Sequence, residues 1–212
     1  MASLRQDAIF NMTKEQEILN AAEEEFFRNG YDATSTAVIA KRAGVTHAMV
    51  NYYFRTKEKL FIQILDNHVY DMLRSLKPLM KKDADVIKVS IDAALTIFDK
   101  MNGDRRLPYL ISDIARMHPD FLLRYKDTFD TVCRESIEMH TLRLRQHVAD
   151  GSVQECTMND IYNTVLTLAT TPFLSIPLLE NVAGMTAERI DRYLLSRREE
   201  MVRILRSRFS RE

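Results

Sequence analysis

Two short helical patterns separated by only two residues constrain the fold of this chain more than any other feature. Capping hydroxyls precede the first pattern, which predicts a helix over about residues 35–43. Thr46 caps the second pattern, which predicts a helix that ends near Phe54. The connection between them, Gly44 and Val45, has the length and composition of the turn in a helix-turn-helix. We therefore expect a helix-turn-helix near the N-terminus.

A longer helix is expected on each side of this pair. Thr13 and Gln16 have the spacing of a capping box, and Gly30 is the residue type that commonly ends a helix, so the first helix lies between them. Its apolar stripe consists of Ile18, Leu19, Ala22 and Phe26. Thr56 opens the fourth predicted helix, which ends before Pro78 and is long enough to link two domains.

Helical periodicity continues through the rest of the chain. A long helix is predicted to begin at Pro119 and to end near Gly151, and a final helix follows Gly184. Pro172 and Pro177 lie inside the penultimate predicted helix, where each removes a helical hydrogen bond, so this helix must kink or split.

These patterns predict an all-α fold of about nine helices in two domains. Residues 1–57 form an N-terminal three-helix helix-turn-helix domain, and residues 1–12 are expected to be a flexible arm in front of it. Residues 58–212 form a second helical domain. A chain of 212 residues is long enough for this division.

The charges of the chain sum to zero but are unevenly distributed. The first predicted helix is acidic, with Glu15, Glu17, Glu23, Glu24 and Glu25. The next two predicted helices are surrounded by positively charged residues, namely Lys41, Arg42, Arg55, Lys57 and Lys59. Glu58 is the only acidic residue among them. A compact basic surface therefore accompanies the helix-turn-helix, as nucleic-acid binding requires.

No membrane-spanning or exported class of protein fits the sequence. The most apolar stretch, residues 161–179, is interrupted by threonines, an asparagine, a serine and two prolines. The N-terminus has no apolar leader segment, so we expect a cytoplasmic protein. Cys133 and Cys156 lack metal-ligand spacing and are expected to be reduced thiols.

Catalytic, metal and cofactor sites are not expected. His140 and His147 lie seven residues apart on one predicted helix, but the sequence supplies no second pair of ligands, so packing or solvent contact explains them better than a metal. His118 precedes Pro119 and fits a turn into a helix. The sequence contains no nucleophile elbow, phosphate loop or zinc-type spacing.

The segment TSTAVIAKRAGVTHAMVNYYFRTKEKL, residues 34–60, resembles the DNA-binding region of the TetR family of bacterial transcriptional regulators. The preceding helix pattern ILNAAEEEFFRNGYDATS, the IAKRAGV turn and the final YYF-x-x-K-E-x-L run occur in the order and spacing of the family. The resemblance covers about the first sixty residues. It implies that the second domain senses a ligand and forms a dimer.

A recognition helix enters the major groove when a partner helix holds it outward. On that basis the base contacts are assigned to His47, Ala48 and Met49 at the start of the third helix. Phosphate contacts, which position a protein without selecting sequence, are assigned to Thr36, Tyr52, Tyr53, Thr56 and Lys57. Core packing is the alternative to a phosphate contact for Tyr52. Lys41 and Arg42 of the basic surface have the alternative of being simply solvated.

A ligand pocket is expected near the kink in the penultimate helix, because a kink opens space between helices. Its predicted lining is mostly apolar with a few hydroxyls, and consists of Phe98, Met101, Tyr109, Phe129, Thr167, Thr170, Thr171 and Phe173. Plain core packing explains the same residues equally well. The predicted ligand is a small apolar or amphipathic molecule.

The last helix carries an apolar stripe that fits a dimer interface, because the resemblance implies that the final two helices of each subunit pair with a second copy. The stripe consists of Ile190, Leu194, Met201, Ile204 and Leu205. The same stripe also fits a core. The arginines of this helix are expected to be solvated.

The sequence as a whole predicts a homodimeric, ligand-responsive repressor that binds a palindromic operator and is released by a small molecule. Two alternatives stay open at this point. One is a ligand-independent protein that organises DNA, and the other is an all-helical enzyme or adaptor.

Overall fold

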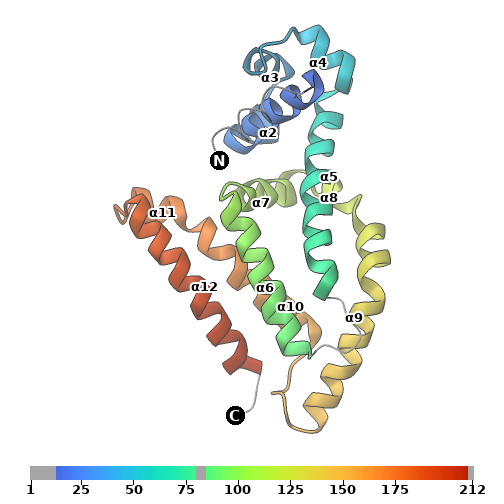
Figure 1. Cartoon of the computed structure of the whole chain (residues 1–212), viewed down its shortest axis with the longest axis vertical. Helices are drawn as coiled ribbons and strands as arrows, with labels where there is room; N and C mark the ends of the chain where they lie inside the picture. The colour runs from blue at the N-terminus through green and yellow to red at the C-terminus, as the bar shows by residue number, and fades with distance from the viewer. Residues whose placement is uncertain (1–12, 80–84, 210–212) are drawn as a thin grey trace. The chain divides into compact units, whose positions relative to one another are not determined.

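The computed structural model describes residues 13–79 and 85–209 (Figure 1). The predicted arm over 1–12 lies outside the described residues. In chain order the elements are α2 (Lys14–Ala33), α3 (Thr36–Arg42), α4 (His47–Phe54), α5 (Lys57–Leu76), the 3-10 turn η1 (Lys77–Leu79), α6 (Val86–Gly103), α7 (Leu107–Met117), α8 (Pro119–Leu123), α9 (Lys126–Ala149), α10 (Met158–Leu174), α11 (Ile176–Asn181) and α12 (Ala187–Phe209). Every element in the described ranges is helical, which confirms the all-α prediction.

Side-chain caps begin the helices where the sequence places them. The Thr13 hydroxyl accepts a hydrogen bond from the Gln16 amide at 3.2 Å, and the Thr46 hydroxyl accepts one from the Met49 amide at 3.3 Å. At the start of α10, Thr157 and Asp160 form a reciprocal capping box. Local sequence therefore fixes these helix starts.

The predicted penultimate helix is split, as its prolines require. α10 contains Pro172 and ends at Leu174, with Ser175 as its C-cap. Pro177 occupies the first turn of α11, where a missing amide proton costs nothing. The Ser175 hydroxyl donates to the Pro172 carbonyl at 2.8 Å and so satisfies an acceptor at the break. The sequence thus predicted the interruption itself, and the structure places it at Ser175.

The long helix predicted to begin at Pro119 is also divided, into α8 and α9. This break was not predicted. Phe121 is buried in one compact unit of the chain and Tyr125 in the other, so the backbone turns between them at residues 124–125. Periodicity alone does not reveal such a break, because both aromatic side chains fit one helical stripe.

The chain folds into two compact units that do not follow chain order. Among the described residues, the first comprises 13–70 and 110–121, and the second comprises 71–79, 85–109 and 122–209. The domain boundary expected between residues 57 and 58 stays a prediction.

The core of the first unit is aromatic. The Phe61 ring lies 4.8 Å from the Phe26 ring, 4.8 Å from the Tyr31 ring and 5.5 Å from the Phe121 ring, measured between centroids. Phe26 and Phe61 are fully buried. This cluster fixes the end of α2 against the start of α5.

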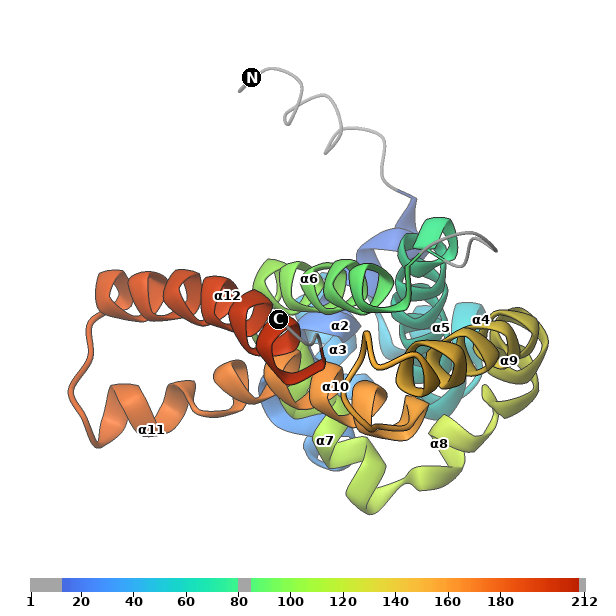
Figure 2. The same cartoon turned by 90° about the horizontal axis from the view of Figure 1, so that it is seen from below.

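The second unit is built on three mutually packed helices, α6, α10 and α12 (Figure 2). α9 packs on α6 and α10. The apolar stripe of α12 supplies much of this core. No helix in the described ranges combines the length and the apolar content needed to span a bilayer.

The burial of α12 corrects the predicted dimer interface. Ile190, Leu194, Met201 and Leu205 are buried within their own chain, and only Ile204 reaches the surface. A second copy has no access to a side chain that its own subunit already covers. These four residues therefore belong to the core, which was the alternative that the stripe left open.

Candidate nucleic-acid interface

The helix-turn-helix turn is held by backbone hydrogen bonds and one left-handed residue. Gly44 adopts a φ of +64°, a conformation that glycine reaches at low cost, and the Val45 amide donates to the Ala40 carbonyl at 3.0 Å. Ile39 on α3 and Val50 on α4 are buried. The inner faces of both helices are therefore fixed, and the opposite face of α4 points to solvent.

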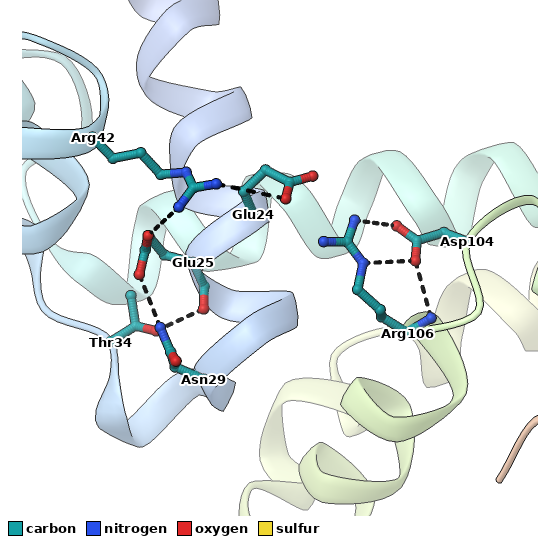
Figure 3. Close-up of polar contacts among 7 residues, drawn as sticks. All are labelled: Glu24, Glu25, Asn29, Thr34, Arg42, Asp104 and Arg106. Atoms are coloured by element: carbon teal, nitrogen blue, oxygen red, sulfur yellow. Dashed lines mark hydrogen bonds and ion pairs between the residues drawn. The ribbon is translucent and has the colours of Figure 1, made fainter. Parts of the chain in front are cut away.

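A buried carboxylate joins α2 to α3 (Figure 3). Glu25 accepts from the Arg42 guanidinium at 2.7 Å and from the Asn29 side-chain amide at 2.9 Å. Arg42 also lies 3.8 Å from Glu24. Because Glu25 is buried, this arrangement compensates the cost of removing its charge from water.

The end of α2 is closed by Thr34, which is buried. Its hydroxyl donates to the Glu25 carbonyl oxygen at 3.1 Å (Figure 3). It also lies 2.8 Å from the Gly30 carbonyl oxygen. Gly30 has a φ of +76°, so the chain leaves the regular helix there. The network of Glu25, Arg42, Asn29 and Thr34 thus sets the angle at which α3 follows α2. The sequence indicated the glycine and the threonine, but not the ion pair.

The predicted base-contacting residues lie on the accessible side of α4. His47 and Ala48 are exposed, and Met49 is half-buried. The imidazole of His47 is hydrogen-bonded to the Thr36 hydroxyl at 2.8 Å through Nε2 and to the Asn51 side-chain amide at 3.5 Å through Nδ1. His47 therefore bridges α3 and α4, and it must exchange one of these partners to contact a base.

Two adjacent tyrosines form the most exposed aromatic feature of this surface. Tyr52 is 74% exposed and Tyr53 is also exposed, and their rings meet edge to face with centroids 5.3 Å apart. Each carries a phenolic hydroxyl that can donate to a phosphate oxygen. The exposure of Tyr52 excludes core packing, the alternative considered from the sequence.

Like Thr36, two further predicted phosphate-binding residues are already engaged within the protein. The Thr56 hydroxyl accepts from the Lys59 amide at 3.1 Å and so caps α5. The Lys57 ammonium donates to the Tyr31 carbonyl at 3.0 Å and lies 4.2 Å from the centroid of the Tyr31 ring. Lys57 thus fastens the start of α5 to the end of α2.

None of the predicted ligand-pocket residues lines the open groove described below, and the predicted pocket stays a prediction. Phe98 and Phe173 are buried with their ring centroids 4.8 Å apart, and the Tyr109 hydroxyl donates to the Phe173 carbonyl. Burial and the negative charge of Glu180 raise the pKa of Tyr109.

The other predicted pocket residues lie elsewhere. Met101 is buried, and the Thr170 hydroxyl donates to the Leu166 carbonyl at 2.7 Å. The remaining three residues are exposed, namely Phe129, Thr167 and Thr171. An open groove of about 680 Å³ in the second unit is lined instead by other residues, among them Ile87, Ile91, His147, Val153 and Arg206.

The N-terminal part of the chain matches a known family model. Residues 18–64 match the model described as bacterial regulatory proteins, tetR family. Over 55 residues the chain is 42% identical to the HTH-type transcriptional regulator QacR of Staphylococcus aureus, a match that covers 26% of this chain and 29% of QacR. This chain therefore aligns with less than a third of that relative.

Two further similarities extend over most of the chain. It is 21% identical over 164 residues to the fatty acid metabolism regulator protein of Bacillus subtilis, covering 71% of this chain and 84% of that protein. The solved structure of a SmeT–triclosan complex superposes with a TM-score of 0.58 at 19% identity, covering 95% of this chain and 93% of that one. The similarity to the SmeT structure shows that the two chains share a fold.

Proposed function

We propose that this chain is a homodimeric transcriptional repressor of the TetR family, because residues 18–64 match the model of that family and the HTH-type regulator QacR is 42% identical over 55 residues. It binds a palindromic operator in cytoplasmic DNA and is released by a small molecule. One observation carries this proposal above the others. α4 is held against α3 by its buried face, while its opposite face presents accessible side chains, as a recognition helix requires.

Base contacts are proposed for the first turn of α4, at His47, Ala48 and Met49. The Ala48 methyl and the Met49 thioether are suited to thymine methyl groups, and the His47 imidazole to a hydrogen-bonding base edge. Phosphate contacts are proposed for Tyr52 and Tyr53, whose exposure supports the assignment.

The remaining phosphate assignments, Thr36, Thr56 and Lys57, stay proposals that require an exchange of partners. Each side chain is hydrogen-bonded within the protein. DNA phosphate must therefore replace or share the existing bond. Lys57 can keep its place over Tyr31 and still contribute positive potential to the surface.

The ligand proposed for the second unit is a small apolar or amphipathic molecule. Two comparisons support this class. One relative is named for regulating fatty acid metabolism, and one solved neighbour was captured with triclosan, an apolar phenol.

A second copy of the chain is the proposed occupant of the outer face of α10–α12. Leu174, Leu178 and Val182 follow one another at four-residue steps and are all exposed, Val182 to 77%. Leu195 and Ile204 are exposed on α12. Exposed apolar side chains are candidates for an interaction site, and a palindromic operator requires a symmetric pair of subunits.

A selection from randomised DNA tests the function. Purified protein is incubated with a random duplex library, and bound DNA is sequenced after several rounds. The proposal predicts enrichment of an inverted repeat. Protein with Met49→Ala and Tyr52→Ala serves as the control and should lose the enrichment.

Two results would contradict the proposal. Broad retention of all sequences indicates a DNA-organising protein. Absence of DNA retention indicates an adaptor or an enzyme.

A further inference from the structure

Three polar side chains form a hydrogen-bonded row that crosses from α3 to α4. The Thr36 hydroxyl lies 2.8 Å from Nε2 of His47, and the side-chain amide of Asn51 lies 3.5 Å from Nδ1 of the same ring. Both nitrogens of the His47 imidazole are therefore engaged. Asn51 ends the row on the exposed surface of α4, and the DNA contacts proposed above do not include it.

The row leaves hydrogen-bonding capacity on Asn51. A neutral imidazole donates through one nitrogen and accepts through the other, whereas a primary amide has two N–H donors and an oxygen with two lone pairs. One bond to His47 therefore leaves Asn51 with at least one donor and one acceptor, whichever ring nitrogen carries the proton. Its side chain makes no other hydrogen bond within residues 13–79 and 85–209. Asn51 thus presents a donor and an acceptor to solvent.

The position of Asn51 on α4 brings it beside the proposed base contacts. Around the helix axis it lies about 60° from Ala48 and about 40° from His47, each one turn earlier. Ala48 is exposed and its side chain is a single methyl group, so a base edge can approach the Asn51 amide past it. Asn51 therefore adjoins the surface that the proposed function places in the major groove.

Adenine carries the complementary pair of groups on its major-groove edge. It presents the N7 acceptor beside the N6 amino donor, and a side-chain amide can bond to both atoms at once. Guanine presents two acceptors, cytosine a donor, and thymine an acceptor beside a methyl group. Adenine is therefore the base that matches a donor and an acceptor held side by side.

We propose that Asn51 reads an adenine in each half-site of the operator, as a specificity-determining residue, and that His47 is the positioning residue that holds its amide. The inference rests on the proposed function. A contact of 3.5 Å is long for a hydrogen bond, so it orients the Asn51 amide and leaves it able to turn onto a base. In this role His47 keeps both of its partners, in contrast to the direct base contact proposed for it above.

Base substitutions in the selected inverted repeat test the role of Asn51. Binding of the full-length protein is measured with each base pair replaced in turn, and the wild type should prefer adenine at one position of each half-site. Asn51→Ala should reduce that preference by about 10- to 100-fold, the discrimination of a bidentate base contact, and keep the preferences elsewhere. Asn67→Ala, which removes an exposed asparagine of α5, is the matched control. Base preferences that all survive Asn51→Ala would overturn the inference.

Asn51→Asp gives a stricter arm. The carboxylate has the shape of the amide but only accepts hydrogen bonds, and acidic side chains accept from the amino group of cytosine. The preferred base at this position should therefore change from adenine to cytosine, even though the added negative charge weakens binding overall. An adenine preference that persists in Asn51→Asp would contradict the assignment.

A modified base tests the contact from the side of the DNA. In 7-deazaadenine a CH group replaces N7, so the acceptor for the Asn51 amide is lost. This base should weaken wild-type binding by about 3- to 10-fold and leave the binding of Asn51→Ala unchanged. Equal responses of the two proteins would contradict a bond between Asn51 and N7.

A double-variant cycle tests the role of His47. If His47 acts through Asn51, His47→Ala should reduce the adenine preference at the Asn51 position, and adding it to Asn51→Ala should cause no further loss there. A direct base contact by His47 instead predicts a changed preference at a different position, which persists in the Asn51→Ala background. That second result would overturn the positioning role.

The same selection separates this inference from the proposed function. If the protein selects an inverted repeat whose base preferences do not depend on Asn51, the inference is wrong and the proposed function stands. If it selects no repeat, the proposed function is wrong, and the inference that rests on it fails as well.

Discussion

At the residue scale, the structure shows that several cationic or polar side chains of the helix-turn-helix surface are held by the protein itself. Arg42 pairs with Glu25, Lys57 bonds to Tyr31, and His47 bonds to Thr36. The sequence predicted that these residues lie in one surface. It could not predict their partners, because the Arg42–Glu25 pair spans 17 residues and depends on the angle between two helices.

Substitution of a residue that contacts a base should have a different effect on DNA binding from substitution of a residue that contacts a phosphate. Met49→Ala should change the preference at its base position by about 1–3 kcal/mol, because a contact to a base edge distinguishes sequences. Tyr52→Phe should weaken binding to all sequences by a similar factor, because a phosphate contact does not. Parallel binding curves on variant half-sites measure both. An altered sequence preference in Tyr52→Phe, or an unaltered one in Met49→Ala, would contradict the assignment.

The Arg42–Glu25 pair should be visible in stability. Arg42→Met leaves the buried Glu25 carboxylate with Asn29 as its remaining side-chain partner, and should lower the free energy of unfolding by about 1–3 kcal/mol. Adding Glu25→Gln removes the uncompensated charge and should restore part of the loss. Urea denaturation measures both, with Lys41→Met on the exposed surface as the control. Strictly additive losses in the double variant would show that the two groups are not coupled.

At the scale of elements, the sequence predicted correctly where helices start. It did not predict which other helix or subunit each apolar helix face packs against. Caps at Thr13, Thr46 and Thr157 are local and were visible as short motifs. The stripe of α12 was equally compatible with a core and with a dimer interface, because both bury apolar side chains at the same spacing. Only packing against α6 and α10 decides between them.

The capping box of α10 gives a prediction with a pH dependence. Thr157→Ala should lower stability by about 1 kcal/mol near neutral pH, the usual effect of losing an N-cap. The hydrogen bond from the Thr157 hydroxyl lowers the pKa of Asp160. A carboxylate with a lowered folded-state pKa stabilises the fold above its unfolded pKa of about 3.9, and this contribution is lost as pH falls through the folded value. The difference in Tm between wild type and Thr157→Ala should therefore narrow below about pH 4, and a constant difference would argue against the linkage.

The two faces of the C-terminal helices should respond oppositely to introduced charge. Leu194→Glu places a carboxylate in the core of the second unit and should prevent stable folding. Leu178→Glu with Val182→Glu charges the exposed face and should yield a folded monomer. Circular dichroism and sedimentation distinguish these outcomes. A folded Leu194→Glu protein, or a dimeric double variant, would contradict the corrected interface.

At the scale of the whole molecule, each compact unit is built from segments that are not consecutive in the sequence. Residues 110–121 belong with the N-terminal unit, although they follow α6 in the sequence. This grouping rests on contacts such as those of Tyr31 with His118 and with Phe121, whose ring centroids are 5.0 Å and 5.1 Å away. Periodicity along the chain carries no information about pairings so distant in sequence. The sequence therefore predicted the fold class and the helix-turn-helix, but not the division of the remaining helices.

The most direct test of the central claim is a footprint of the purified protein on the inverted repeat that it selects. Two recognition helices related by a twofold axis should protect two half-sites whose centres lie about 34–36 Å apart, or a multiple of that distance. Leu178→Glu with Val182→Glu should protect the same half-sites only at much higher concentration. Continuous protection without a repeated half-site, or protection of a single half-site by wild-type protein, would contradict the claim that this chain is a dimeric operator-binding regulator.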